Sequence, residues 1–273
     1  MIAIVTDSTA YLTHEEAVEL GVVIVPMSYS FGKDMSLNEG CIENDEHAER
    51  QVAEGIDHVH TSQATLAGFL NAFQRLRRAG YEVLCITISS RLSGTYANAV
   101  LAAKELGGSH IEVVDSLTTC SGLYLLIREA RKRIREGAKL SAVAKELKEL
   151  RKRVRMRFSV DDMAPLRRSG RLGNVRMSIS TVLNIKPILE LKDGAIVSVS
   201  LARGRVEQTR RLCAFCEGVE GEIVVNSFLA DEAAARLAVQ LAGDAREVER
   251  RRVGPVLGAH LGAGCLGVCY IER

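Results

Sequence analysis

Two short segments rich in hydroxyl side chains are the parts of this chain best suited to bind an anion. The first, residues 89–95, follows an apolar run at 83–88 and precedes a helical pattern, so its serines and Thr95 lie at a helix N-terminus. The first N–H groups of a helix lack acceptors within the helix and carry partial positive charge. With Ser93 as a donor and Gly94 admitting a ligand close to the backbone, this turn favours a carboxylate or a phosphate. A plain N-cap, in which the serines satisfy only the backbone, explains the same pattern.

The second segment is Thr61-Ser62-Gln63, which opens an amphipathic helical pattern over residues 66–76. We expect Thr61 or Ser62 to be the N-cap of that helix, so that a second helix N-terminus displays hydroxyls. His260 is a third candidate for contact with the anion, because it opens a glycine-rich segment. A core histidine is the alternative, and the glycines favour a position facing a ligand.

The elements that must position these residues are short apolar runs separated by helical patterns. Strands that are apolar on both faces and alternate with helices predict a parallel sheet with helices on both sides. The turns after such strands gather at one edge, where these sheets bind ligands. Such turns contain Asp7, Ser8, Ser93 and Asp115. The acidic stretch at 36–55 is interpreted as a surface loop leading into a short helix near 45–52. The expected strands are residues 2–5, 22–25, 83–88 and 111–114.

The pattern changes after residue 155, where we place a domain boundary. Asp193-Gly194 between two apolar runs predicts a β-hairpin, and the elements that follow predict a mixed sheet. The sequence therefore predicts an α/β protein of two domains. Residues 1–155 form a three-layer α/β/α domain with a parallel sheet, and residues 156–273 form an α/β domain with a mixed sheet. The helices expected from residue 121 onward are 121–135, 141–153, 207–216 and 231–241, and the strands are 188–191, 195–201, 222–227, 246–253 and 266–271.

Composition limits the classes of function. A net charge of +2 on 273 residues argues against a polyanion-binding protein, and six Tyr, six Phe and no Trp leave little aromatic surface for stacking bases. Glutamates interleave with the basic stretches, as on a solvated ion-pair face, so we expect no nucleic-acid partner. No signal-peptide pattern opens the sequence, no apolar run reaches the ~20 residues of a membrane span, and seven scattered cysteines suit a reducing compartment. We therefore expect a cytoplasmic protein without a transmembrane segment.

Seven motifs occur in order along the chain: TDSTAYLT at 6–13, TSQAT at 61–65, ISSRLSGTYANA at 88–99, VVDSLTTCSG at 113–122, LRRSGRLGNV at 166–175, LNIKPIL at 183–189 and HLGAGCLGV at 260–268. Together they resemble the DegV family of bacterial fatty-acid-binding proteins over nearly the whole chain. The resemblance implies a long-chain fatty acid, such as palmitate, stearate or oleate, in a tunnel between the domains, and no other cofactor. Some members of that family present the fatty acid to a separate ATP-dependent kinase, which makes an acyl phosphate. The binding protein is then not itself an enzyme.

The resemblance also implies which residues hold the carboxylate. They are the hydroxyls of Thr61 or Ser62 and of Ser93, with the backbone of Gly94 and Thr95 and the side chain of His260 nearby. We expect these donors to hold the buried head group without a fixed cation, which leaves the carboxylate able to act as a nucleophile. The family pattern is broken at Tyr11, Ala64, Ser169 and Ala263.

A cluster of arginines is interpreted as a contact with the kinase or with its phosphates. The cluster comprises Arg167, Arg168, Arg171 and Arg176, together with Arg203 and Arg205. Ordinary surface solvation explains the same residues equally well. For the wall of the tunnel we suggest Phe69, Leu92, Ile179 and Leu183.

The sequence leaves three other interpretations open. In the first, the ligand of the predicted site is not a fatty acid but an anionic amphiphile of another kind, such as a lysophospholipid, a retinoid or an isoprenoid acid. Alternatively, Ser93 with His260 and an aspartate, Asp7 or Asp115, makes a serine esterase or thioesterase, although Ser93 lies outside a G-x-S-x-G motif. Asp7 more readily caps the turn that follows it. A zinc site at Cys213 and Cys216 with Cys265 and Cys269 is disfavoured by their apolar setting, so we expect no metal.

Overall fold

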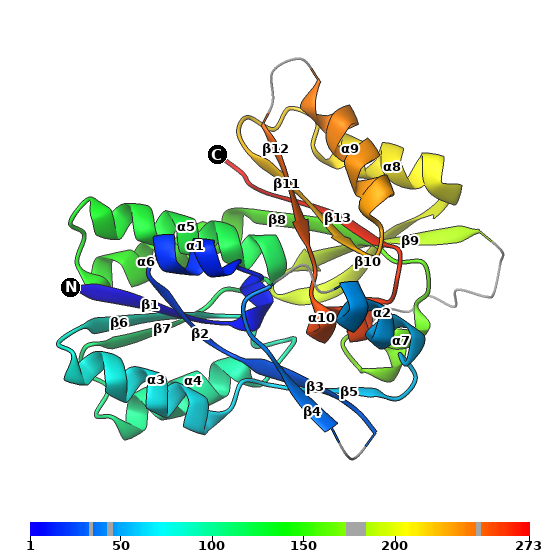
Figure 1. The fold of residues 1–273 in the computed structure, drawn as a ribbon. Helices are drawn as coiled ribbons and strands as arrows, with labels where there is room; N and C mark the ends of the chain where they lie inside the picture. The colour runs from blue at the N-terminus through cyan, green and yellow to red at the C-terminus, as the bar shows by residue number, and fades with distance from the viewer. Residues whose placement is uncertain (33–34, 43–45, 173–183, 244–246) are drawn as a thin grey trace.

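The computed structural model describes residues 1–32, 35–42, 46–172, 184–243 and 247–273. Its strands form three sheets of four, six and three strands (Figure 1). The four-stranded and six-stranded sheets each have their own helices, and the three-stranded sheet projects from the four-stranded one. This arrangement confirms the predicted α/β class.

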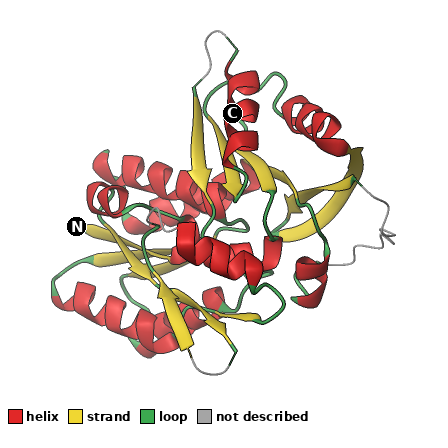
Figure 2. Ribbon diagram, turned by 45° about the vertical axis from the view of Figure 1, so that its right-hand side comes forward, coloured by secondary structure: helices red, strands yellow, loops and turns green. Residues whose placement is uncertain are grey.

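The four-stranded sheet is parallel and lies between two layers of helices (Figure 2). Its order is β2-β1-β6-β7, with α3 and α4 packed on one face and α5 and α6 on the other. The three-layer arrangement explains why these strands are apolar on both faces. The elements are β1 (Ile2–Asp7), β2 (Val22–Val25), β6 (Glu82–Thr87), β7 (Ile111–Asp115), α1 (His14–Glu19), α3 (Leu66–Arg78), α4 (Thr95–Glu105), α5 (Cys120–Arg135) and α6 (Leu140–Leu150), with 3-10 turns at Ser8–Ala10 and Arg151–Arg153.

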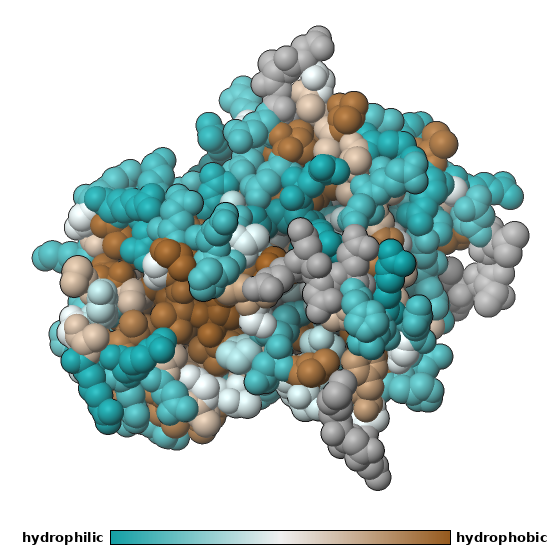
Figure 3. Space-filling model, viewed as in Figure 1, coloured by the Kyte–Doolittle hydropathy of each residue, from teal (hydrophilic) through white to brown (hydrophobic). Residues whose placement is uncertain are grey.

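One edge of this sheet reaches the surface. Strand β2 is the edge strand, and its two middle residues, Val23 and Ile24, are half-buried. Figure 3 shows hydrophobic residues gathered there, between the polar outer faces of the two helix layers.

The six-stranded sheet is mixed, as predicted. Its order is β10-β9-β8-β13-β11-β12, and β11 with β12 is its parallel pair. The predicted hairpin joins β9 to β10 through Asp193 and Gly194, which both have positive φ, as a tight hairpin turn requires. Helices α8 and α9 cover the outer face. The elements are β8 (Val154–Ser159), β9 (Ile185–Lys192), β10 (Ala195–Arg203), β11 (Ile223–Phe228), β12 (Val248–Arg252), β13 (Cys265–Ile271), α8 (Gly204–Phe215) and α9 (Asp231–Ala242).

Helix α5 joins the two large sheets. It packs on β1 and β6 of the parallel sheet and on β8, β11 and β13 of the mixed sheet. Its first eight residues, 120–127, are all buried, whereas its basic residues gather in the last turns. A helix enclosed on two sides is apolar around most of its circumference, so α5 has an amphipathic pattern only in its second half.

The three-stranded antiparallel sheet corrects two expectations. Residues 36–39 belong to strand β4 rather than to a surface loop, whereas the short helix expected near 45–52 is confirmed as α2. Thr61 and Ser62 end strand β5 rather than cap a helix, and α3 is capped by Thr65, whose Oγ1 accepts a hydrogen bond of 3.0 Å from the N–H of Gly68. Alternating side chains in MSYSF and VHTS produce these strands. The elements are β3 (Met27–Phe31), β4 (Met35–Glu39), β5 (Val59–Ser62) and α2 (Glu46–Glu54).

Two short helices, α7 (Ala164–Arg168) and α10 (Pro255–Leu261), pack against each other, and α10 also contacts α2, β3 and β5. The N-terminus of α10 is held by two buried side chains. Glu39 accepts a hydrogen bond of 2.8 Å from the N–H of Val256 and another of 2.8 Å from the hydroxyl of Ser8. The hydroxyl of Tyr11 accepts a bond of 3.1 Å from the N–H of Leu257. Strand β4 and the turn after β1 therefore fix where α10 begins.

The Glu39 carboxyl is 7% exposed, and burial raises its pKa to about 7, against the opposing effect of its two hydrogen bonds. The folded protein therefore binds this proton more tightly than the unfolded chain does. The resulting stability is present below pH 4.5, the ordinary value for this group, and is lost as the pH rises through about 7.

Replacement of Glu39 by Gln should remove this dependence, because the amide keeps the shape of the neutral carboxyl. Between pH 4.5 and 8 the wild type should lose about 3 kcal/mol of unfolding free energy relative to Glu39→Gln. Urea unfolding at several pH values measures the difference. The exposed Glu15→Gln is the matched control and should follow the wild type. Parallel curves for wild type and Glu39→Gln would contradict the assignment.

Candidate ligand-binding site

A cavity of about 350 Å³ lies where the three sheets meet. This volume is within the range of about 300–1,000 Å³ that is usual for small-molecule sites. Most of its wall is apolar, and β8, β9, β10 and α10 are among the elements that contribute to it. The apolar wall includes Met156, Phe158, Leu191, Ile196, Val256 and Leu257.

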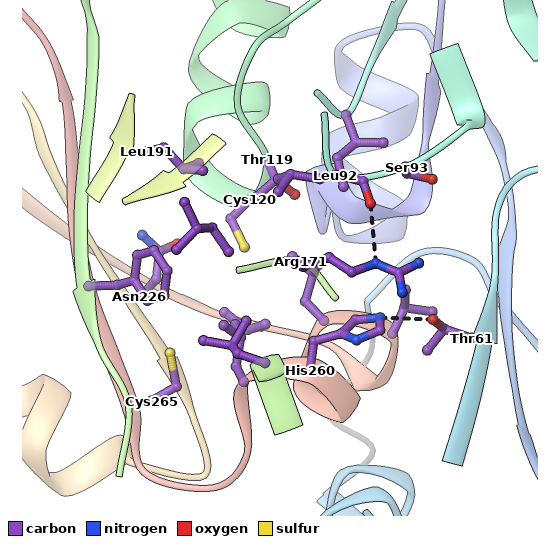
Figure 4. Close-up of a pocket in the computed structure, with 18 of the residues that line it drawn as sticks. Thr61, Leu92, Ser93, Thr119, Cys120, Arg171, Leu191, Asn226, His260 and Cys265 are labelled. Carbon is purple, nitrogen blue, oxygen red and sulfur yellow. Dashed lines mark hydrogen bonds between the residues drawn. The ribbon is translucent and has the colours of Figure 1, made fainter. Parts of the chain in front are cut away.

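Polar side chains gather at one end of the cavity (Figure 4). Thr61 from β5 and His260 from α10 face each other, and Thr61 Oγ1 lies 2.8 Å from His260 Nε2. Ser93, from the turn between β6 and α4, lies on the same side. Its Oγ is 2.9 Å from Thr95 Oγ1 and accepts a bond of 3.3 Å from the N–H of Thr95. Thr61 and Ser93, which are 32 residues apart in sequence, therefore line the same cavity.

His260 is neutral at neutral pH. Burial lowers its pKa to about 4, and the positive charge of Arg171 acts in the same direction. A neutral imidazole has one N–H donor and one acceptor nitrogen, so either partner of the His260–Thr61 pair can be the donor.

Arg171 adds a positive charge to the cavity, which was not expected from the sequence. Its side chain points into the cavity, where Nε donates to the carbonyl of Leu92 over 3.4 Å and Nη1 donates to the carbonyl of Ser169. Within the described ranges, no carboxylate forms an ion pair with Arg171. The expectation that no fixed cation accompanies these hydroxyls and the imidazole is therefore wrong, because the guanidinium of Arg171 lines the same cavity.

Of the remaining predicted site residues, one lines the cavity and two lie behind its wall. Ser62 lines the cavity, whereas Gly94 and Thr95 do not. A side chain at Gly94 would place its Cβ 2.1 Å from Gln63 Oε1, so this glycine makes room for Gln63 rather than for a ligand. Thr95 is fully buried and accepts a bond of 3.2 Å from the N–H of Ala64, which ties α4 to the segment after β5.

The other predicted arginines lie outside the cavity. Arg167 and Arg168 on α7, Arg203 at the end of β10 and Arg205 on α8 are exposed. Arg168 pairs with Asp57, and Arg205 pairs with Asp161 at 2.6 Å.

Arg176, with Ile179 and Leu183 from the suggested wall, lies outside the described residues. Of the other suggested wall residues, Leu92 lines the cavity and Phe69 belongs to the core under α3.

Most of the residues that sequence reasoning missed are apolar side chains, several of them on the mixed sheet. Met156 and Phe158 alternate with basic residues in VRMRFS, a period-two pattern that predicts a strand with one apolar face. That signal was present in the sequence. Which face would border a cavity depends on how the sheet packs against α5 and α10.

The geometry does not assemble a Ser–His–Asp triad. Ser93 pairs with Thr95, and His260 pairs with Thr61. Asp7 accepts from the N–H and hydroxyl of Thr9 and from the N–H of Ile88, which confirms it as the cap of the first turn. Asp115 accepts from two backbone N–H groups in the turns after β6 and β7. In the part of the chain that the structure describes, no group of three His, Cys, Asp or Glu side chains could hold a metal ion.

Comparison with known proteins identifies the same family that the sequence motifs resemble, and solved structures of that family have the same fold. The family model described as "Uncharacterised protein, DegV family" matches residues 1–273. The chain belongs to the DegV family. A DegV domain-containing protein of Halalkalibacterium halodurans is 35% identical over 285 residues, covering 100% of this chain and 99% of the relative.

Two solved members of the DegV family are similar over their whole length. A DegV family protein from Thermus thermophilus, described by its fatty acid binding, is 30% identical with a TM-score of 0.87, covering 100% of this chain and 99% of that chain. DegV from Bacillus subtilis, described as a fatty acid binding protein, is 29% identical with a TM-score of 0.85 and the same coverage. Among the helices of the described residues, none has the length and apolar character needed to cross a membrane.

Proposed function

We propose that this DegV protein binds a long-chain fatty acid in the cavity. The carboxylate lies against Thr61, Ser93, Arg171 and His260, and the acyl chain follows the apolar wall. The observation that carries the proposal is the position of Arg171, a cation without a carboxylate partner in the described chain, at the polar end of an apolar cavity. A ligand with one negative charge and a long apolar tail is complementary to that arrangement. The fatty acid binding described for the Thermus and Bacillus relatives supports it.

The energetics favour such a ligand. A buried carboxylate is costly unless it is paired and hydrogen-bonded, and the guanidinium with two hydroxyls supplies both requirements. Each hydrogen bond to a charged group contributes about 1.5–3 kcal/mol. The tail contributes about 0.8 kcal/mol for each CH₂ removed from water, so it supplies most of the affinity while the head group sets the orientation.

The protein then presents the fatty acid to a separate ATP-dependent kinase. This part of the proposal is supported by the motif pattern and by the exposed arginines. Leu166 lines the cavity, and the next residue, Arg167, is exposed on the same short helix, so a positive surface adjoins the site. A positive surface suits contact with an acidic protein face or with phosphates.

Organic extraction of the purified protein, followed by mass spectrometry, tests the identity of the ligand. We expect a long-chain fatty acid in amounts approaching one per chain, since the cavity has one head-group site. A phosphorylated lipid in its place would favour the other anionic amphiphiles, because a guanidinium binds phosphate as well as carboxylate. Failure to extract or to load any lipid would end the proposal.

Removal of the cation should weaken binding more than removal of one hydroxyl. Arg171→Gln should lower fatty acid affinity about ten- to hundredfold, through lost charge-assisted hydrogen bonds. Ser93→Ala and Thr61→Val should each have a smaller effect in the same direction. Displacement of a fluorescent fatty acid measures the affinities, and Arg167→Gln, which removes the same charge outside the cavity, should bind like the wild type. Equal affinities for Arg171→Gln and Arg167→Gln would mean that the head group lies elsewhere.

Charge reversal outside the cavity tests the kinase contact. The double variant Arg167→Glu/Arg203→Glu should bind fatty acid normally and yet support slower ATP-dependent formation of acyl phosphate by a bacterial fatty acid kinase subunit. Added salt should slow the wild type toward the variant, because exposed charges are screened. An unchanged rate would remove these arginines from the contact.

A further inference from the structure

The cavity has a deeply buried end away from the head-group residues. Figure 4 shows Asn226 and Cys265, which both line the cavity, on the side of Arg171 opposite Thr61. Asn226 is 7% exposed and Cys265 is 3% exposed, so solvent hardly reaches this end. An acyl chain whose carboxylate lies against Arg171 and Thr61 therefore extends toward a closed end.

Three residues lie side by side on the mixed sheet at this closed end. Gly267 on β13 is paired with Phe158 on β8 and with Asn226 on β11. All three line the cavity, as expected because directly paired residues point to the same face of a sheet. Across these strands, the floor of the cavity therefore consists of an aromatic ring, a position without a side chain and an amide.

Gly267 is explained by close packing rather than by backbone conformation. Its φ lies outside the left-handed region, and a glycine inside a strand often marks a close approach of other atoms. A β-carbon at position 267 would lie 2.9 Å from the Cβ of Phe158 and 3.2 Å from the carbonyl oxygen of Arg157. The glycine therefore allows Phe158 to lie close to β13. Leu189, paired with Phe158 on its other side, is fully buried, so the depression in the floor is on the glycine side.

Size distinguishes Phe158 from its neighbours at the closed end. Cys265 is small and lies two residues from Gly267, on the same face of β13. Asn226 is held in place, because its Oδ1 accepts a hydrogen bond from the hydroxyl of Ser121 on α5. The ring of Phe158 is the largest of these side chains and borders the depression over Gly267. The room for the end of an acyl chain therefore depends on this ring.

We propose that Phe158 sets the longest acyl chain that the cavity accepts, with its ring as the stop for the terminal methyl group. The proposal rests on the proposed function and adds to it a residue that determines chain length. Without the ring, the space over Gly267 joins the cavity, so a longer acid can bury more methylenes. Each additional buried CH₂ raises the affinity roughly fourfold.

The experiment measures the affinities of unbranched saturated acids of even chain length, from decanoic to eicosanoic acid, by displacement of a fluorescent fatty acid from the full chain. Phe158→Ala should move the best-bound acid to a longer chain. The acid that is two carbons longer than the wild-type optimum should gain roughly tenfold in affinity relative to that optimum. Phe158→Leu should shift the optimum in the same direction by less, because it keeps most of the apolar volume.

Leu191→Ala is the matched control. Leu191 lines the cavity from β9, which β8 separates from the strand of Gly267. Its truncation should weaken every acid by a similar factor and leave the best-bound length unchanged, because it removes apolar contact away from the stop.

Two outcomes would overturn the inference while fatty acid binding stands. One is a wild-type length profile in the Phe158 variants, and the other is an equal shift of the optimum in Leu191→Ala. If Phe158→Ala does not fold, as judged by circular dichroism and urea unfolding, the more conservative Phe158→Leu decides between these results. Failure of the wild type to bind any acid would instead contradict the proposed function.

Discussion

A positive charge enclosed in an apolar cavity is the constraint on which the proposed site depends. The Arg171 guanidinium is held by the carbonyls of Leu92 and Ser169 rather than by a carboxylate within the described chain. Carbonyl oxygens orient the group without neutralising it, so its field remains available to an anion. The same field helps to keep His260 uncharged, which makes the imidazole a neutral hydrogen-bonding partner of Thr61. The cation thus acts on the protonation of the histidine in the same cavity as well as on an incoming anion.

Placing these groups within reach of one ligand requires all three sheets. The parallel sheet contributes the turn with Ser93, the small antiparallel sheet contributes Thr61, and strands β8, β9 and β10 of the mixed sheet contribute part of the apolar wall. Helix α5 fixes the two large sheets relative to each other, and α10 carries His260 between the small sheet and the mixed one. The site is therefore a property of the packing between layers, and a change at Glu39 or Tyr11 reaches it through the N-terminus of α10.

Strands and turns that depend on the local order of residues could be predicted from the sequence. Apolar runs identified β1 and β6, and Asp193-Gly194 identified the hairpin, because period and turn chemistry are local properties. The hydroxyl pattern predicts Thr61 or Ser62 as an N-cap, whereas both lie at the end of a strand, since hydroxyl residues are common at both positions. The sequence groups Arg171 with the arginines interpreted as a kinase contact, because nothing local distinguishes it from Arg167 and Arg168. Its position in the cavity results from contacts with residue 92, far away in the chain.

The place of β13 in the mixed sheet has a consequence for how the protein is made. This strand follows every other described strand in sequence, yet it lies between β8 and β11 near the centre of the sheet. The sheet therefore cannot close until residues 265–271 have left the ribosome, and contacts between such distant segments form slowly. Until then, α5 and the inner faces of β8 and β11 expose apolar surface that a chaperone would recognise. The wall of the cavity is among the last parts of the molecule to be completed.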